Sequence, residues 1–262
     1  MTLQATGIRH AIGGKTILDG IDLTAHPGEV TAIVGPNGSG KTTLLRVLTG
    51  EDRAHGTVTL NGTPVTPANA PQLAAMRGVL PQASRIAFPF KVAEVVRIGL
   101  HSGPHGRDTA IAERALEAVD LATFADRFYQ ELSGGEQQRV QLARVLAQVW
   151  QPTFDTGPCW LFLDEPVASL DIGHQLGIMQ LARDYALRGG GVITVMHDLN
   201  LTAMFADRIA AMKGGRIIAH GSPDNVLTDE VLSDAYGCRL RTSTPPPAPM
   251  RYVLPQSAGG AA

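Results

Sequence analysis

The chain has 262 residues, of which 44% are hydrophobic and 18% are charged, and its formal net charge is −2. This length fits one large α/β domain, or a core with a small inserted subdomain, and the composition is that of a folded globular protein. The balanced charge, without a basic stripe, predicts no nucleic-acid partner. Because no run of 18 apolar residues occurs and residues 1–10 lack a secretory apolar core, we expect a cytoplasmic protein.

Three segments near the N-terminus alternate, or nearly alternate, apolar with polar residues, as half-exposed strands do. Glycine-containing turns at residues 13–14 and 61–62 mark the ends of these segments. We therefore expect an antiparallel β layer made by residues 3–8, 17–23 and 57–60.

Residues 30–34 form a short apolar run that predicts a buried strand, followed by a glycine-rich turn and a helical stretch over 42–49. The turn fits the pattern G-x-x-x-x-G-K-S/T at every fixed position. Glycines let such a backbone wrap closely round a phosphate, and its N–H groups and the positive end of the next helix face the anion. We expect a phosphate site made by Gly35, Pro36, Asn37, Gly38, Ser39, Gly40, Lys41, Thr42 and Thr43.

Within this loop, Lys41 is expected to bring its charge to the β- and γ-phosphates of a nucleotide, and the Thr42 hydroxyl to ligate Mg²⁺. Thr43 adds a hydroxyl for the α-phosphate. The loop alone does not distinguish ATPases from GTPases or small-molecule kinases, and a structural glycine-rich turn is the remaining alternative.

From about residue 84 to residue 150 the pattern becomes helical. Apolar residues recur there at spacings of three and four, which is typical of helices with one buried face. We expect an inserted helical subdomain with helices near residues 92–100, 108–119 and 136–150.

Two later apolar runs, residues 160–163 and 192–196, predict buried strands, and strands separated by helices imply a parallel sheet. Ligands lie at the carboxyl ends of such strands. Asp164 and Glu165 follow the first run, and two adjacent acids suggest a metal ion and a reactive water, because burying a lone carboxylate is costly. Asp164 is placed to hold Mg²⁺ and Glu165 to act as general base on the water; the alternative is a solvated turn.

The segment Leu132-Ser133-Gly134-Gly135-Glu136-Gln137-Gln138 resembles the signature motif of ABC ATPases. Locally, Ser133 with Glu136 three residues on predicts a capping box that opens an amphipathic helix. The resemblance extends over about residues 3–237. It implies a P-loop NTPase (RecA-like) core with a parallel sheet, an N-terminal antiparallel β layer and an inserted α-helical subdomain.

The ATP-binding domain that this resemblance implies spans residues 1–241, with the helical subdomain inserted at about residues 84–150. The remaining tail, residues 242–262, is rich in proline, glycine and alanine. Such a composition buries little apolar surface, so we expect the tail to be poorly ordered.

The resemblance also implies that the chain binds ATP and Mg²⁺ and works as a homodimer, with two ATP molecules between the subunits. One helix start cannot easily reach the phosphate loop of its own sheet, so the signature segment is expected to face the second subunit's nucleotide. The residues expected on that partner nucleotide are Ser133, Gly134, Gly135, Glu136 and Asp171.

Three further positions take their roles from the resemblance. Gln82 is expected to touch Mg²⁺ and the lytic water, and to begin the segment that contacts a membrane partner. His197 is expected to contact the γ-phosphate and position the water, although a lone histidine after a strand is usually structural. His10 stands where the family usually stacks an aromatic ring on adenine, and its smaller ring offers less stacking area; the alternative is a surface side chain.

Residues 198–203, 206–209 and 221–228 are similar to ATPases that serve importers of iron-siderophores, hemin and cobalamin, while residues 143–150 and 160–166 favour hemin. This similarity implies two transmembrane permease subunits, a periplasmic binding protein that acts indirectly, and a peripheral location on the cytoplasmic face of the inner membrane. The alternatives are a siderophore or cobalamin importer ATPase, and a non-transport ABC ATPase of iron–sulfur assembly or DNA repair. A P-loop kinase or GTPase would not need the signature segment.

Overall fold

The computed structural model describes residues 1–82, 86, 88–103, 106 and 108–258. Its N-terminal part is an antiparallel sheet in the order β2–β1–β4–β5, which confirms the layer expected from the alternating segments. The strands are β1 (Leu3–Ile12), β2 (Lys15–Ala25), β4 (His55–Leu60) and β5 (Thr63–Pro64).

The main sheet has the order β12–β11–β3–β10–β9–β6, and every neighbouring pair is parallel except β11 with β12. All residues of β3, β9 and β10 are buried, which explains why these three strands are near-continuous apolar runs in the sequence. The strands are β3 (Val30–Val34), β6 (Arg77–Leu80), β9 (Trp160–Asp164), β10 (Gly191–Val195), β11 (Arg208–Lys213) and β12 (Arg216–Gly221).

The main sheet separates two hydrophobic cores. Along β9, Trp160 and Phe162 point into the core shared with the antiparallel sheet and α1 (Lys41–Leu48), whereas Leu161 and Leu163 point into the core on the other face. The helices outside the inserted region are α1, α2 (Ala70–Met76), α6 (Ile172–Leu187), α7 (Leu199–Phe205), α8 (Pro223–Val226) and α9 (Asp229–Tyr236).

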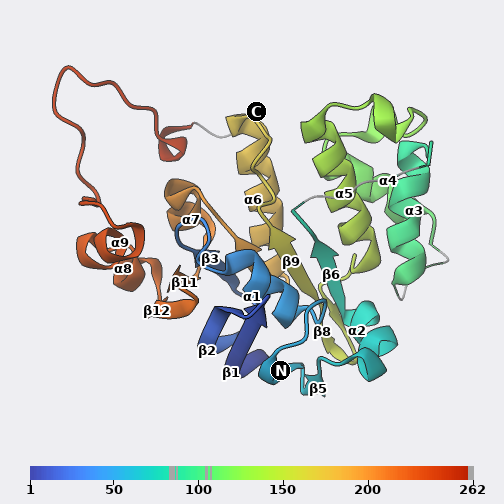
Figure 1. The fold of residues 1–262 in the computed structure, drawn as a ribbon. Coiled ribbons are helices and arrows are strands. Elements are labelled where there is room, and N and C mark those ends of the chain that lie inside the picture. The colour runs from blue at the N-terminus through green and yellow to red at the C-terminus, as the bar shows by residue number, and fades with distance from the viewer. Residues whose placement is uncertain (83–85, 87, 104–105, 107, 259–262) are drawn as a thin grey trace.

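The helices α3 (Val92–Ser102), α4 (Ala110–Glu117) and α5 (Gly134–Gln148) stand together at one side of the molecule (Figure 1). They agree with the three helical segments expected from periodicity. Helices α3 and α5 pack closely, because a Cβ on Gly99 would lie 1.9 Å from the carbonyl oxygen of Arg144. The expected N-terminal boundary of this region, residue 84, lies outside the described residues.

The connector between α5 and β9 contains a small hairpin of β7 (Thr153–Phe154) and β8 (Gly157–Pro158), which the sequence analysis did not anticipate. Short 3₁₀ helices occur at Pro67–Asn69, Ala122–Phe124, Tyr129–Glu131 and Pro255–Ser257.

The described part of the tail, residues 242–258, leaves α9 and returns to α7 (Figure 1). Thr242 bonds to Asp229 through its backbone nitrogen at 2.7 Å, and Gln256 Nε2 donates to the Asn200 carbonyl at 3.4 Å. Most of the residues between these anchors are exposed.

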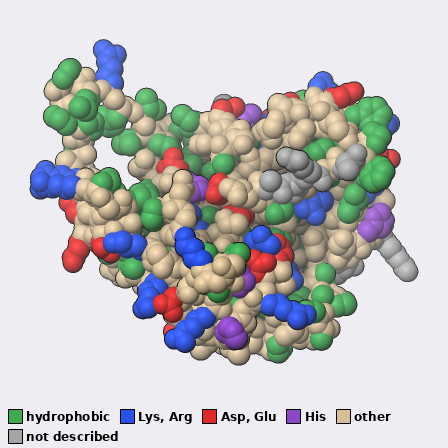
Figure 2. Space-filling view, in the orientation of Figure 1, with side chains coloured by type: hydrophobic (Ala, Val, Ile, Leu, Met, Phe, Trp, Pro, Cys, Tyr) green, Lys and Arg blue, Asp and Glu red, His purple; other side chains and the backbone are tan. Residues whose placement is uncertain are grey.

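Within the described residues, no helix is both long and apolar enough to cross a bilayer. On the face shown in Figure 2, Lys and Arg side chains are interspersed with Asp and Glu, and hydrophobic side chains gather at the side formed by α3. The large exposed apolar residues of that region are Phe88, Ile98 and Phe128.

Candidate active site

The phosphate loop joins β3 to α1 and depends on two glycines. Gly35 has φ 146° and Gly40, the N-cap of α1, has φ 100°, both in the region that favours glycine. A Cβ on Gly35 would lie 2.2 Å from the Met212 carbonyl oxygen of β11, so a larger residue does not fit. The chain therefore turns sharply from strand to helix, and the unpaired N–H groups of the first turn of α1 begin at the loop.

Lys41, the first residue of α1, folds back over this loop. Its Nζ donates to the carbonyl oxygens of Gly35 at 2.9 Å and Pro36 at 3.0 Å. Burial lowers the pKa of the ammonium, while the charges of Glu165 and Asp164 act in the opposite direction. Because an ammonium has three donors, one remains for an anion in the loop.

Asp164 ends β9 beside the start of α1. The Thr42 hydroxyl donates to Asp164 Oδ1 at 3.2 Å, and Asp164 is only 3% exposed. Burial raises the pKa of this carboxyl to about 6, and the bond from Thr42 offsets part of that effect. A hydroxyl beside a carboxylate offers the oxygen donors that Mg²⁺ prefers, and a cation would relieve the cost of burying the charge, so these two residues fit the ion.

Glu165 follows directly and has an unusual backbone. Its φ is 52°, a left-handed conformation that costs roughly 1–2 kcal/mol in a residue with a Cβ. Its Oε1 lies 2.5 Å from His197 Nε2, and its backbone nitrogen donates to the Val195 carbonyl at 3.2 Å. Since a carboxylate only accepts, the hydrogen bond requires a proton on Nε2 of His197.

The carboxyl ends of β9 and β10 thus place a carboxylate and an imidazole in contact beside Lys41 and Asp164. A carboxylate held in this way can take a proton from a water molecule, and the neighbouring imidazole can orient that water. The arrangement is suited to hydrolysis of a phosphate ester or anhydride bound in the loop.

Two further expected site residues, Gln82 and His10, make no hydrogen bond or ion pair with this group among the described residues. In the register of β6 with β9, Leu80 pairs with Leu163, so Gln82 stands two residues past β6 just as Glu165 stands two past Leu163. Gln82 is exposed. His10, on β1, bonds through Nδ1 to the Arg53 carbonyl at 2.8 Å, and this contact holds the ring beside the segment that follows α1.

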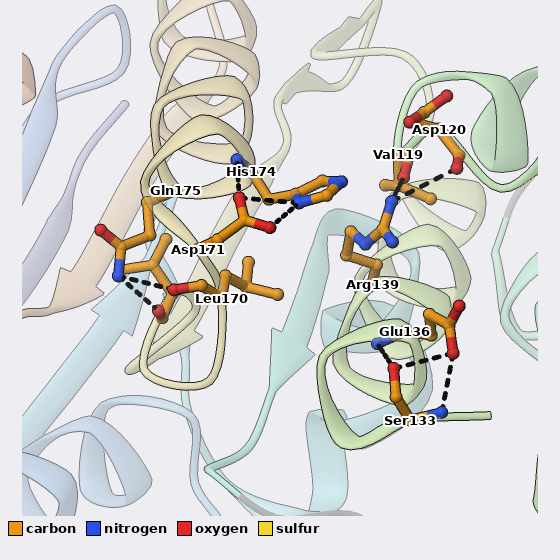
Figure 3. Close-up of polar contacts among 10 residues, drawn as sticks. Val119, Asp120, Ser133, Glu136, Arg139, Leu170, Asp171, His174 and Gln175 are labelled. Atoms are coloured by element: carbon orange, nitrogen blue, oxygen red, sulfur yellow. Dashed lines mark hydrogen bonds and ion pairs between the residues drawn. The ribbon is translucent and has the colours of Figure 1, made fainter. Parts of the chain in front are cut away.

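The signature segment opens α5 with the predicted capping box (Figure 3). Ser133 donates its backbone N–H to Glu136 Oε2 at 2.7 Å, and its Oγ accepts from the Glu136 N–H at 3.4 Å. The hydrogen bonds from Ser133 lower the pKa of the Glu136 carboxyl. A Cβ on Gly135 would lie 3.0 Å from the Ser169 carbonyl oxygen, so α5 begins tightly against the segment that leads to α6.

Asp171 is the N-cap of α6, and two contacts that the sequence analysis missed surround it (Figure 3). His174 Nδ1 lies 2.9 Å from each Asp171 carboxylate oxygen, and Gln175 Nε2 donates to the Leu170 carbonyl at 3.0 Å. His174 stands three residues after the N-cap, and a side chain at that position can reach back to the N-cap residue. This spacing could have indicated the contact of His174 with Asp171.

The structure therefore gathers most of the expected residues into two groups. The phosphate loop, Asp164, Glu165 and His197 form the first, and residues 133–136 with Asp171 form the second. No hydrogen bond or ion pair joins residues 133–136 to residues 35–43 within the described part of the chain.

A family model described as ABC transporter matches residues 18–168. The chain belongs to the ABC transporter family. It is 58% identical over 258 residues to the hemin import ATP-binding protein HmuV of Roseobacter denitrificans, covering 98% of this chain and 99% of that protein. A relative of the same description from Jannaschia sp. is 58% identical over 262 residues, covering 99% of this chain and 97% of its own length.

Solved ABC cassettes share the fold. A nucleotide-free ATP-binding cassette of an ABC transporter superposes with a TM-score of 0.74 at 27% identity, covering 89% of this chain and 96% of that one. A dimeric bacterial ABC transporter cassette gives a TM-score of 0.74 at 26% identity, covering 84% and 98%. This ABC protein therefore binds and hydrolyses ATP, and the kinase and GTPase alternatives are set aside.

Proposed function

We propose that this ABC protein is the ATP-hydrolysing subunit of a hemin importer. The observation that carries the proposal is the identity of 58% over nearly the whole chain to two relatives described as hemin import ATP-binding proteins. We assign residues 1–241 to one ATP-binding domain, with the helical region of about residues 84–150 inserted in it.

ATP is proposed to bind at residues 35–43, with Lys41 as the phosphate ligand and His10 beside the adenine. Thr42, Asp164 and Gln82 would hold Mg²⁺, which supplies charge neutralisation for the phosphates when bound. The contact of Thr42 with the buried Asp164 supports this assignment.

Glu165 is proposed to take the proton of the attacking water, with His197 and Gln82 orienting that water. The contact of 2.5 Å between Glu165 and His197 supports the pair, because it fixes which carboxylate oxygen faces the imidazole. As phosphoryl transfer proceeds mainly by positioning and charge stabilisation, this preorganisation is the main contribution the pair makes.

We propose a homodimer in which Ser133, Gly134, Gly135, Glu136 and Asp171 contact the ATP of the partner subunit. The dimeric cassette with the same fold supports this arrangement. The start of α5 supports it too, since its backbone N–H groups and two glycines suit an approaching phosphate. Closure would add charge-assisted hydrogen bonds, and hydrolysis would remove the phosphate that links the halves.

The partners proposed beyond the dimer are two permease subunits, with a periplasmic binding protein acting through them, at the cytoplasmic face of the inner membrane. The exposed apolar side chains near α3, namely Phe88, Ile98 and Phe128, suit contact with such a permease. All three follow Gln82 in the chain, and Ile98 lies on α3 itself.

The test is ATPase activity of the subunit with its permease in liposomes, with and without hemin-loaded binding protein. We expect stimulation by the hemin-loaded form, abolished by Glu165→Gln. A response to a siderophore or cobalamin instead would overturn the assignment of hemin as the cargo. Absence of permease association would favour a non-transport ABC ATPase.

A further inference from the structure

Gln138 touches the general base of the proposed mechanism from the signature helix. It lies on α5, five residues after the N-cap Ser133. Its side-chain Nε2 donates to the backbone carbonyl of Glu165 at 2.9 Å, in a partly buried environment. The contact joins two segments that lie 27 positions apart in the sequence.

Glu165, whose carbonyl accepts this hydrogen bond, is the residue with φ 52°. A non-glycine residue keeps such a conformation only where its surroundings over-determine it. Here the Glu165 nitrogen donates to the Val195 carbonyl, and its carboxylate contacts His197. Its carbonyl accepts from Gln138 Nε2 at 2.9 Å and from the Ala168 N–H at 3.3 Å. The contacts with Val195 and His197 come from β10 and the residues after it, and the contact with Ala168 comes from the loop of Glu165 itself. Gln138 adds a shorter hydrogen bond to the same carbonyl from α5.

Other glutamines of α5 bind backbone carbonyls elsewhere. Gln137 Nε2 donates to the Leu132 carbonyl at 3.1 Å. Gln148 Nε2 donates to the carbonyls of Ala74 at 2.9 Å and Arg77 at 3.1 Å. Glutamine side chains of α5 thus commonly bond to the backbone of other segments, but of these glutamines Gln138 is the one that bonds to a residue of the proposed active site.

We infer that Gln138 is a positioning residue for ATP hydrolysis, because it keeps the Glu165 peptide in the conformation that aims the carboxylate at His197. The inference rests on the proposed function of Glu165. It also makes α5 a rigid link: Ser133 and Gln138 are separated by about 7.5 Å of helix, so a shift at the helix start moves the Glu165 peptide. In the proposed dimer, this link couples the partner's nucleotide to the subunit's own base.

The test compares Gln138→Leu with Gln148→Leu, using the full chain with its permease in liposomes. Both glutamines lie on α5, and each substitution removes side-chain hydrogen bonds to backbone carbonyls of other segments. For Gln138→Leu we expect turnover to fall about tenfold with the KM for ATP nearly unchanged, and the Hill coefficient for ATP to fall, because the base is misplaced while the loop is intact. Gln148→Leu should show a similar change in thermal stability with normal turnover.

Equal turnover in the two variants would overturn the inference, as would a loss in Gln138→Leu confined to KM. If Gln138→Leu does not fold, Gln138→Glu preserves the size while losing the donor, and the same outcomes apply. In the Glu165→Gln background, Gln138→Leu should cause no further loss of the residual rate, whereas an undiminished tenfold loss would contradict positioning through Glu165. Full activity of Glu165→Gln alone would instead overturn the proposed function itself.

Discussion

At the scale of single residues, burial acts on two opposite charges of the site. It raises the pKa of Asp164 to about 6 and lowers that of Lys41. Both side chains keep their charged forms at a cost in the absence of ligand. The site is therefore organised for a charged ligand rather than for the stability of the free protein.

This cost gives a pH-dependent prediction for Asp164→Asn. The carboxyl titrates near 3.8 when unfolded and about 6 when folded, so the wild type loses stability as the pH rises between these values. Without nucleotide or divalent cation, the variant should be more stable at pH 8 by about 3 kcal/mol, and this advantage should shrink at pH 5. Urea unfolding at both pH values measures it, and an advantage independent of pH would contradict the assigned cause.

At this scale, the sequence predicted site residues best where they are neighbours in the chain. The phosphate loop and the Asp164–Glu165 pair are contiguous motifs, and the structure places both at the carboxyl edge of the main sheet. The contact from Gln138 to Glu165 could not be predicted in the same way, because the register of α5 against that edge depends on tertiary packing.

At the scale of elements, three adjacent strands of the main sheet were predicted from the sequence and several other strands were not. β3, β9 and β10 were expected from apolar runs that reflect burial on both faces. β5, β6, β11, β12 and the β7–β8 hairpin were not predicted as strands. Segments of two to four residues contain too little pattern to distinguish a strand from a loop, whereas β11 was missed although four of its six residues are buried. Their place is set by pairing with neighbours, as β6 pairs with β9.

The close packing of α3 on α5 predicts the effect of Gly99→Ala. Its new methyl would meet the Arg144 carbonyl oxygen, so we expect a loss of roughly 1–3 kcal/mol in the free energy of unfolding. The matched control is Gly177→Ala on α6, where no atom lies within 4 Å of the added Cβ and a gain of roughly 0.5–1 kcal/mol is expected. Chemical denaturation measures both free energies of unfolding. Equal effects of the two substitutions would contradict the close packing of α3 on α5.

At the scale of the whole molecule, the chain carries two separate groups of expected nucleotide-contacting residues. The phosphate loop with Glu165 and His197 forms one, and the start of α5 with Asp171 forms the other. Gln138 connects them within one chain. The homodimer is proposed from family resemblance, since the pattern within one sequence does not specify how two copies meet.

The measurement that tests this account most directly is the mass in solution of the Glu165→Gln variant, by size-exclusion chromatography with light scattering. We predict a dimer with ATP and a monomer without it, because hydrolysis no longer opens the closed state. Adding Ser133→Arg should abolish the ATP-dependent dimer, since the larger side chain blocks the approach of the start of α5 to the partner's phosphate. A Glu165→Gln protein that stays monomeric with ATP, or a dimer that survives Ser133→Arg, would contradict the shared nucleotide site.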